Sequence, residues 1–312
     1  MPLRILHVLD HSLPLHSGYT FRTRAILKSL QARGVEVRGI TGLRQEEPGP
    51  AVEEVDGIVF HRTPGESTGP AGVREWREIG EFAEAIDRLC DEWQPDLLHA
   101  HSPAICGAAA LRVAKRRGIP LVYEIRAFWE DAAVSNGTGS EGNLKYRLTR
   151  ALESHVVAGA DAVVTICQGL KDDLVLRGVP ANKIMLSPNG VDLDLFGQAA
   201  PREAALAADL ELGDGPVIGF LGSFYPYEGL DDLIAAMPRI VGAVPDARLL
   251  MVGGGPAEAA LRAQAEASPV ADWSSPIRVV LSGRFPPMKA PPPNYSTSRM
   301  TCRSPRSWRT TQ

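Results

Sequence analysis

The strongest constraint on the fold is a regular alternation of short apolar runs with longer amphipathic segments. Continuous apolar runs bounded by turn residues are typical of parallel strands that are buried on both faces. Five such runs occur early in the chain: RILHVL (4–9), VEVRGIT (35–41), DLLHAHS (96–102), PLVYEIR (120–126) and DAVVTIC (161–167). Helical patterns separate them, and the clearest places on one face Trp76, Ile79, Ala83, Ile86, Cys90 and Trp93. The alternation predicts a doubly wound α/β domain.

A second α/β series follows the punctuated segment LSPNGVDLDLF (186–196). Its expected strands are PVIGFLG (216–222), ARLLMVGGG (247–255) and IRVVLSG (277–283). We therefore expect two Rossmann-like domains, residues 1–195 and 196–285, with a cleft that faces the carboxyl ends of both sets of strands.

The last residues, 286–312, break this pattern. They contain six prolines and five basic side chains but no acidic residue and no Leu, Ile, Val or Phe. Such a composition cannot supply core strands. We expect a disordered basic tail of the kind that a frameshift would produce, and a second domain that is incomplete.

The composition indicates which partners and which cellular compartment to expect. A formal charge of −4 gives no reason to expect a nucleic-acid partner. The four cysteines show no close pairing, which favours a reduced, cytoplasmic protein. The opening apolar run is too short for a signal peptide, and no later run approaches the length of a membrane span. Any membrane contact is expected to be peripheral.

One segment could make such a contact. NLKYRLTRALESHVV (143–157) has Lys145, Arg147 and Arg150 beside leucines at helical spacing. Two interpretations stay open: a core helix with a solvated basic face, or a helix that lies on an anionic membrane surface.

The loop after the first expected strand is unusually polar. HVLDHSLPLHSGYT (7–20) carries no dinucleotide-binding glycine pattern, but it ends in Ser17-Gly18 with Thr20 as a plausible helix N-cap. Gly18 would let a ligand approach the backbone, and the first helical turn would attract an anion such as phosphate. The alternative is an ordinary tight turn between strand and helix.

Two further strand ends carry polar residues. His99 and His101 alternate on one face of their strand, so both point to one side at its carboxyl end. As zinc ligands they would need partners, and none lies nearby at ligand spacing, whereas as hydrogen-bond donors they need none. A structural pair is equally consistent. Glu124 and Arg126 end the next strand, where either a polar ligand or a salt-bridged rim would explain them.

The second series repeats this geometry. GFLGSFYPYEGLDDLIAA (219–236) places Ser223 and Glu228 in a loop between a strand and a helix. Gly253 and Gly254 stand in a triple glycine after the next strand. This is either a turn that faces a nucleotide or a flexible connection.

Together these motifs resemble glycosyltransferase family 4, retaining enzymes of the GT-B fold, over residues 3 to about 285. They are most similar to the exosortase A system-associated glycosyltransferases. The resemblance implies transfer of a hexose from a nucleotide-sugar donor to a lipid-linked or polysaccharide acceptor in exopolysaccharide biosynthesis, with no cofactor or metal. It implies that Ser17 and Gly18 contact the donor, that His101 is catalytic beside the donor sugar, and that His99, Glu124 and Arg126 serve the acceptor side.

Two departures from the family pattern matter. The family places an Arg and a Lys facing the donor diphosphate, where this chain has Ser223 and Glu228. With Gly253 and Gly254 these remain the donor-binding candidates of the second domain. The family's paired-glutamate motif has no match at its expected place. Two rival interpretations stay open: a non-catalytic truncated remnant of such an enzyme and, on the same fold, a sugar-nucleotide 2-epimerase.

Overall fold

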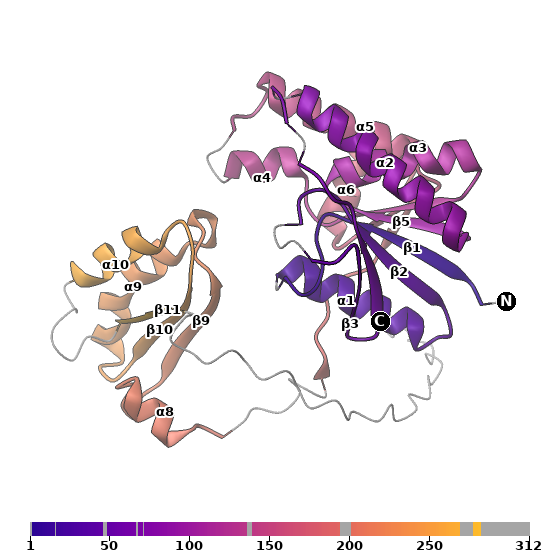
Figure 1. The fold of residues 1–312 in the computed structure, drawn as a ribbon. Coiled ribbons are helices and arrows are strands. Elements are labelled where there is room, and N and C mark those ends of the chain that lie inside the picture. The colour runs from indigo at the N-terminus through magenta and orange to yellow at the C-terminus, as the bar shows by residue number, and fades with distance from the viewer. Residues whose placement is uncertain are drawn as a thin grey trace, which may run out of the picture. The chain divides into compact units, whose positions relative to one another are not determined.

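The computed structural model describes residues 2–15, 17–45, 49–66, 68–70, 72–135, 139–193, 201–268 and 277–281. The chain divides into two compact units, residues 1–200 and 201–312, and each is described by itself (Figure 1). The expected basic tail and the site of the expected frameshift lie outside the described residues.

The first unit is built on an eight-stranded sheet in the order β3-β4-β2-β1-β5-β6-β7-β8. Its strands are β1 (Arg4–Leu9), β2 (Glu36–Thr41), β3 (Val52–Val55), β4 (Ile58–Arg62), β5 (Leu97–His101), β6 (Leu121–Ile125), β7 (Ala162–Thr165) and β8 (Ile184–Leu186). All neighbours run parallel except β3 and β4. The five strands expected from the sequence are confirmed. β3, β4 and β8 were not predicted from the sequence, because they lie toward the two edges of the sheet and carry less continuous apolar runs.

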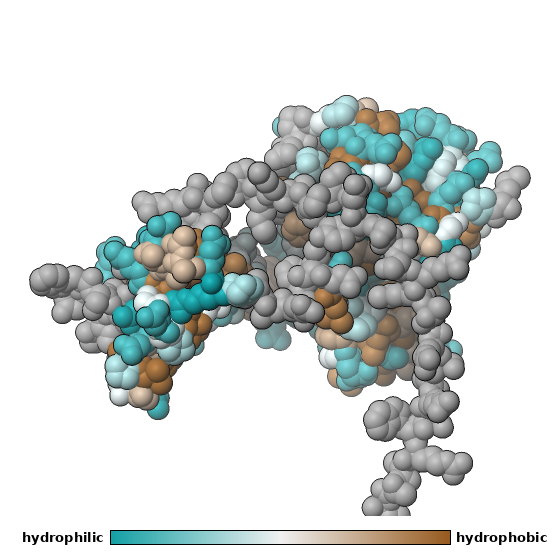
Figure 2. Space-filling model, turned by 90° about the horizontal axis from the view of Figure 1, so that it is seen from below, coloured by the Kyte–Doolittle hydropathy of each residue, from teal (hydrophilic) through white to brown (hydrophobic). Residues whose placement is uncertain are grey.

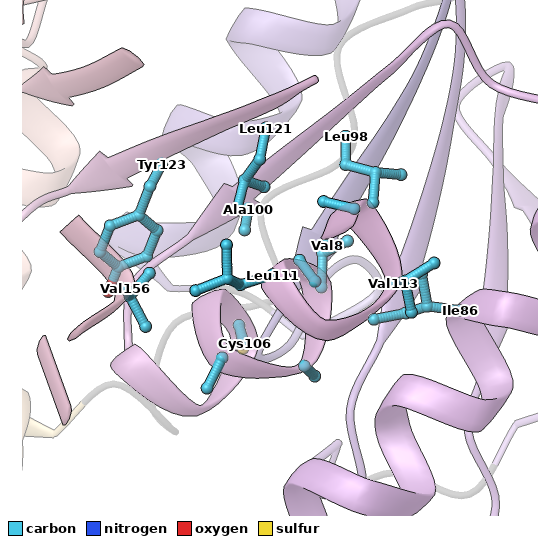
Figure 3. Close-up of a cluster of buried hydrophobic side chains, with 14 of the residues drawn as sticks. Val8, Ile86, Leu98, Ala100, Cys106, Leu111, Val113, Leu121, Tyr123 and Val156 are labelled. Atoms are coloured by element: carbon cyan, nitrogen blue, oxygen red, sulfur yellow. The ribbon is translucent and has the colours of Figure 1, made fainter. Parts of the chain in front are cut away.

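Helices cover both faces of this sheet (Figure 1). They are α1 (Gly18–Gln31), α2 (Val73–Trp93), α3 (Ala104–Arg117), α4 (Trp129–Ser135), α5 (Leu144–Gly159), α6 (Gln168–Leu176) and the short 3-10 turn η1 (Ala181–Lys183). On one face α1 packs through Leu27 against Leu9 and Phe60. On the other, α2, α3 and α5 form the main core, which Figure 3 shows around Leu111 and Tyr123.

The helical stripe predicted for α2 is confirmed at all but one position. Ile79, Ile86 and Cys90 are buried in the main core, so Cys90 is a packing residue. Trp76 was wrongly included, because it is 65% exposed near the start of the helix. The guanidinium of Arg112 lies 6.0 Å from the centre of its ring. The Trp76 ring therefore has a neighbouring cation on one side but is otherwise open to solvent.

The order of the strands marks one place on the sheet for a ligand. The chain proceeds from β1 outward to β2 and β4, and then returns to β5 on the other side of β1. In doubly wound sheets, ligands bind outside the carboxyl ends of strands at such a reversal. The polar loop after β1 and the two histidines of β5 both lie there, since β1 and β5 pair in parallel with His7 opposite His99.

The second unit contains a parallel sheet in the order β11-β10-β9 within the described residues. Its elements are α8 (Ala204–Asp209), β9 (Val217–Ser223), the 3-10 turn η2 (Pro226–Glu228), α9 (Leu230–Ala243), β10 (Arg248–Gly254), α10 (Glu258–Glu266) and β11 (Ile277–Leu281). Phe224, Ile234, Met237, Leu249 and Met251 form its core. The expected α/β fold with two Rossmann-like units is confirmed.

None of the helices that the structure describes is both long enough and apolar enough to cross a membrane. On the face that Figure 2 shows, hydrophobic and hydrophilic residues are intermixed over the described surface.

Candidate functional site

Three histidines meet at the carboxyl ends of β1 and β5. His7 comes from β1, and His99 and His101 come from β5. The ring centres of His99 and His101 lie 4.3 Å apart, and that of His7 lies 4.9 Å from His99. His7 and His101 are completely buried. The sequence analysis placed His99 and His101 together correctly but missed His7, which joins them only through the parallel register.

Hydrogen bonds fix the tautomers of two of these rings. Arg126 Nη2 lies 2.7 Å from His101 Nδ1, and a guanidinium can only donate, so this nitrogen accepts. Neutral His101 therefore carries its proton on Nε2, which donates to His7 Nδ1 at 3.0 Å. His7 in turn carries its proton on Nε2, which has no hydrogen-bond partner among the described residues. The result is a relay of donors that runs from Arg126 to His7.

Burial keeps these imidazoles uncharged. It lowers the pKa of His101 to about 3, with a smaller contribution from His99. It also lowers the pKa of His7 well below its ordinary value, helped by His99 and His101. Glu124 Oε1 lies 3.7 Å from His101 Nδ1 and favours the charged ring, but the cost of burying the charge is the larger effect. At neutral pH the histidines therefore act through their N–H groups.

Glu124 is the single carboxylate beside this cluster in the described part of the chain. It accepts hydrogen bonds from Arg22 Nε and Arg126 Nε, both at 2.9 Å from Oε1. Its other oxygen lies 3.5 Å from His99 Nε2. Burial would raise the pKa of Glu124, but His101, His99 and Arg126 outweigh it and hold that pKa well below its usual range. Two guanidinium groups and one carboxylate leave the cluster with one excess positive charge, which suits an anionic ligand.

Both arginines are held in place by several acceptors. Arg126 also donates to Tyr19 O at 2.9 Å and Thr23 Oγ1 at 3.0 Å on α1. Arg22 donates to Ser187 O at 2.7 Å and Asn189 Oδ1 at 2.9 Å, beyond β8. The network therefore joins α1, β6 and the segment after β8. Arg22 was missed by the sequence analysis, because nothing in a surface-helix pattern indicates partners so far away in sequence.

The histidine cluster could also hold a metal ion. One ring nitrogen each of His7, His99 and His101 lies within 4.8 Å of the others. The partners that the sequence analysis found lacking are thus supplied by the tertiary structure. The proton that Arg126 fixes on His101 Nε2 nevertheless blocks the lone pair that would bind the ion, and the guanidinium repels a cation. The arrangement favours hydrogen bonding, and the expectation that no metal is needed stays a prediction.

The loop after β1 ends in a capped helix. Ser17 is the N-cap of α1, and its Oγ accepts a hydrogen bond from Thr20 N at 3.1 Å. The suggestion of Thr20 as the cap was wrong, because Thr20 already lies inside the first turn. A Cβ added to Gly18 would meet nothing within 4 Å, so open space lies beside this backbone. The N–H groups of Gly18 and Tyr19, in the first turn of α1, have no intrahelical acceptor, so this helix end suits an incoming anion.

A chain of three side chains also runs through this loop. His11 Nδ1 lies 3.0 Å from Asp10 Oδ2, and His11 Nε2 lies 2.8 Å from Ser17 Oγ. The rings of His11 and Tyr19 lie 4.5 Å apart, which supports the imidazole from the side. Asp10 and His11 were not predicted as site residues. The sequence feature that could have indicated them is an acidic residue followed by a histidine directly after a buried strand.

The candidates of the second unit lie at the ends of β9 and β10. Ser223 and Glu228 are exposed, and Glu228 ends the η2 turn just before α9. A Cβ on Gly253 would stand 1.8 Å from Gly222 O, so this glycine is required by the packing of β9 against β10. Gly254 is less confined, since its added Cβ would meet Glu258 Oε2 at 3.3 Å. The first turn of α9 adds Asp231 and Asp232, so acidic side chains follow Ser223 and Glu228, the two positions for which the family resemblance implies cations.

Comparison with known proteins identifies both units. Residues 17–190 match the family described as Glycosyl transferase 4-like domain, and residues 215–296 match Glycosyl transferases group 1. A D-inositol 3-phosphate glycosyltransferase of Segniliparus rotundus is 33% identical over 236 residues, which are 72% of this chain and 50% of that protein. A GDP-mannose-dependent alpha-mannosyltransferase of Mycolicibacterium smegmatis is 26% identical over 81% of this chain and 64% of its own. The chain thus spans only about half the length of the first of these relatives.

Solved structures share the fold. Sucrose-phosphate synthase from Thermosynechococcus elongatus superposes with a TM-score of 0.65 at 20% identity, over 90% of this chain and 70% of that one. Anabaena HepE, solved with UDP and glucose, gives 0.63 at 14% identity, over 89% and 69%. A putative UDP-N-acetylglucosamine 2-epimerase from Listeria monocytogenes gives 0.56 at 14% identity, over 90% and 69%. The fold is therefore that of GT-B proteins, and it is shared by transferases and epimerases alike.

Proposed function

Since the chain belongs to glycosyltransferase family 4, we propose that it transfers a hexose from a nucleotide-sugar donor. The observation that carries this proposal is the polar edge of the first unit. His101, Arg126 and the open backbone at Gly18 lie at the strand reversal where ligands of doubly wound sheets bind. The excess positive charge of Arg22, Arg126 and Glu124 taken together and the N–H groups of α1 suit a diphosphate and sugar hydroxyls.

In this proposal each residue has a distinct task. His101 is the proposed catalytic residue: when the donor binds, its Nε2–H exchanges the acceptor His7 for the reacting sugar. Ser17 and Gly18 bind the donor through the first turn of α1. His99, Glu124 and Arg126 face the acceptor. A mechanism that retains the anomeric configuration, with the leaving phosphate assisting acceptor attack, needs only the fixed donors of this site and no covalent bond between the enzyme and the sugar. The expected acceptor is lipid-linked or a polysaccharide, in exopolysaccharide biosynthesis.

The sequence relatives support a sugar-transfer reaction, but they do not identify its substrates. They include an inositol phosphate glycosyltransferase and a mannosyltransferase that depends on GDP-mannose. The rival 2-epimerase activity draws on the same fold, as the Listeria structure shows. The sequence relatives named above are transferases, which favours transfer over epimerisation. Product analysis with a supplied acceptor separates the two, because only a transferase consumes the acceptor.

The test uses the 312-residue chain with UDP- and GDP-linked hexoses, measuring nucleotide-sugar binding and release of nucleoside diphosphate. Gly18→Val should abolish binding, because its side chain fills the open space beside the helix N-terminus. His101→Ala should lower turnover about a hundredfold or more with binding retained. Ser29→Ala, on the exposed part of α1, is the matched control. Wild-type behaviour of both site variants would contradict the proposed site. Binding without turnover in the parent chain would instead favour the non-catalytic remnant.

A further inference from the structure

We propose that Ser17 is an activated nucleophile, and that the chain Asp10–His11–Ser17 gives this protein reactivity toward small acyl esters. The inference rests on the geometry of the loop after β1 and not on sugar transfer. It concerns side chains that the proposed function either leaves unused, as with Asp10 and His11, or uses only for capping and donor contact, as with Ser17.

The three side chains stand in the order that nucleophilic catalysis requires. A serine hydroxyl is a weak nucleophile unless a base accepts its proton and a third group orients that base. Here Ser17 Oγ lies 2.8 Å from His11 Nε2, and Asp10 Oδ2 lies 3.0 Å from His11 Nδ1. A carboxylate can only accept from Nδ1–H, which leaves Nε2 free to accept the Ser17 proton. Such constellations are recognised by geometry and roles rather than by position in the sequence.

The place of Ser17 in the fold supports the same role. It stands between a strand and a helix at the carboxyl edge of an α/β sheet, where a serine nucleophile is exposed to substrate. The N–H of Gly18, directly after it, and that of Tyr19 belong to the first helical turn, where no intrahelical acceptor exists. These dipoles stabilise negative charge on an attacked carbonyl oxygen. The open space beside Gly18 admits the substrate.

The capping bond of Ser17 is compatible with this chemistry. Its oxygen accepts from Thr20 N at 3.1 Å and lies 3.1 Å from Thr20 Oγ1, whose hydroxyl donates to it when the Ser17 proton points to His11. A backbone N–H that donates to the hydroxyl oxygen also stabilises the alkoxide that forms as the proton leaves. The side chains of Asp10 and His11 are 16% and 20% exposed, so the relay is sheltered while Gly18 stays exposed.

The reaction is an acyl transfer in two steps. Ser17 Oγ attacks the ester carbonyl carbon, and its proton passes to His11 Nε2. The tetrahedral intermediate then breaks the bond to the alcohol oxygen, and the departing alcohol takes the proton from His11. Water subsequently attacks the acyl-serine with His11 as base, which releases the carboxylic acid and restores the Ser17 proton. The products are one acid and one alcohol for each ester and water consumed.

The experiment labels the full 312-residue chain with a fluorophosphonate probe and maps the adduct by tandem mass spectrometry. Wild-type protein should carry one adduct, on Ser17, and should release p-nitrophenol from p-nitrophenyl acetate. His11→Ala should slow labelling about a hundredfold or more, since the base is lost. Asp10→Asn should slow it less, because His11 keeps its place against Tyr19. Neither readout requires a nucleotide sugar, so its failure is separate from failure of the proposed transferase.

Two controls keep the outcome unambiguous. Ser17→Asp removes the nucleophile but retains a good helix cap, so it should fold like the wild type and take no label. Ser29→Ala should label at the wild-type rate. Labelling of Ser17→Asp, an adduct spread over several serines, or an unchanged rate in His11→Ala would overturn the proposal. An unlabelled wild-type chain would overturn it as well.

Discussion

The two units bury different kinds of side chain. In the first, the buried residues include charged and titratable groups: His7, Glu78, His101, Glu124, Glu130 and Glu153. In the second, every residue that is buried among the described positions is apolar. The first unit therefore holds a polar site inside its own interior, whereas the second has no fully buried charged or titratable residue among its described positions. The stability of a unit with a buried polar site should respond more strongly to mutation and to pH than that of a unit whose polar groups are exposed.

The carboxyl edges of the two sheets show the same contrast. In the first unit, paired ions fix the positions of the site residues, as Glu124 does between Arg22 and Arg126. In the second, close backbone packing at Gly253 shapes the edge, and exposed acids surround it. The first edge is thus ordered by electrostatics and the second by sterics. Each can be broken by a change that leaves the other intact.

Neutralising Glu124 should produce the largest effect. Glu124→Gln keeps the shape of the side chain but leaves two guanidinium groups without their buried counter-charge. Breaking a buried pair in this way costs about 3–5 kcal/mol. Glu228→Gln, on the exposed edge of the second unit, should change the free energy of unfolding by less than about 0.5 kcal/mol. Denaturant unfolding of both variants measures the difference, and equal midpoints would remove the proposed distinction between the units.

The stability of the first unit should depend on pH through Glu153. Burial raises the pKa of its carboxyl from 4.5 to about 7. Because the folded-state pKa exceeds the unfolded one, the stabilisation is complete below pH ~4.5 and is lost as pH rises through ~7. The loss by pH 8 is on the order of 3 kcal/mol.

The matched variant for this effect is Glu153→Gln, which cannot titrate. Its free energy of unfolding, subtracted from that of the wild type at each pH, removes the opposite contribution of the histidines. His7 and His101 have lowered pKa values, so they stabilise the fold above pH ~6.5 and less as the pH falls. A wild-type minus variant difference that stays flat from pH 4 to 8 would contradict the prediction.

Glycine substitutions at the two sheet edges should have different effects on stability. Gly253→Ala places a methyl group 1.8 Å from Gly222 O at a φ of 156°, so the second unit should lose at least about 2 kcal/mol. Gly18→Ala adds a methyl group in open space inside a helix and should be neutral or stabilise the first unit by up to about 1 kcal/mol. Thermal unfolding measures both. A well-folded Gly253→Ala variant would show that the edge of β10 can relax.

The smallest expected effect concerns the surface of α5. Leu144 and Leu148 are 72% and 59% exposed beside Lys145, Arg147 and Arg150, while Val156 is buried in the core. The later part of the helix is thus a core element, and its first two turns keep the features of a membrane-surface helix. Flotation should carry a fraction of the protein with anionic vesicles and less of Leu148→Ser. Recovery of all protein in the soluble fraction, with either vesicle charge, would refute the contact.

The sequence alone determined the architecture, because strand and helix periodicity are local properties. The runs at 4–9, 96–102 and 120–126 became β1, β5 and β6, and the positions of His99 and His101 at the end of their strand followed from alternation. The capping rule predicted Thr20 as the N-cap of the first helix, whereas the cap is Ser17, three residues earlier. The same local rules wrongly predicted that Trp76 is buried. Periodicity indicates the face of the helix on which a residue lies, but not whether a neighbouring element covers that part of the face.

Only the tertiary structure decided which polar groups meet and in what protonation state. His7 joins His99 through the register of β1 with β5, and Arg22 reaches Glu124, 102 residues away in sequence. The lowered pKa of His101 arises from burial, which no single segment reveals. The physical reason is range: hydrophobic periodicity is written within one element, whereas hydrogen bonds, ion pairs and desolvation depend on atoms that different elements bring together.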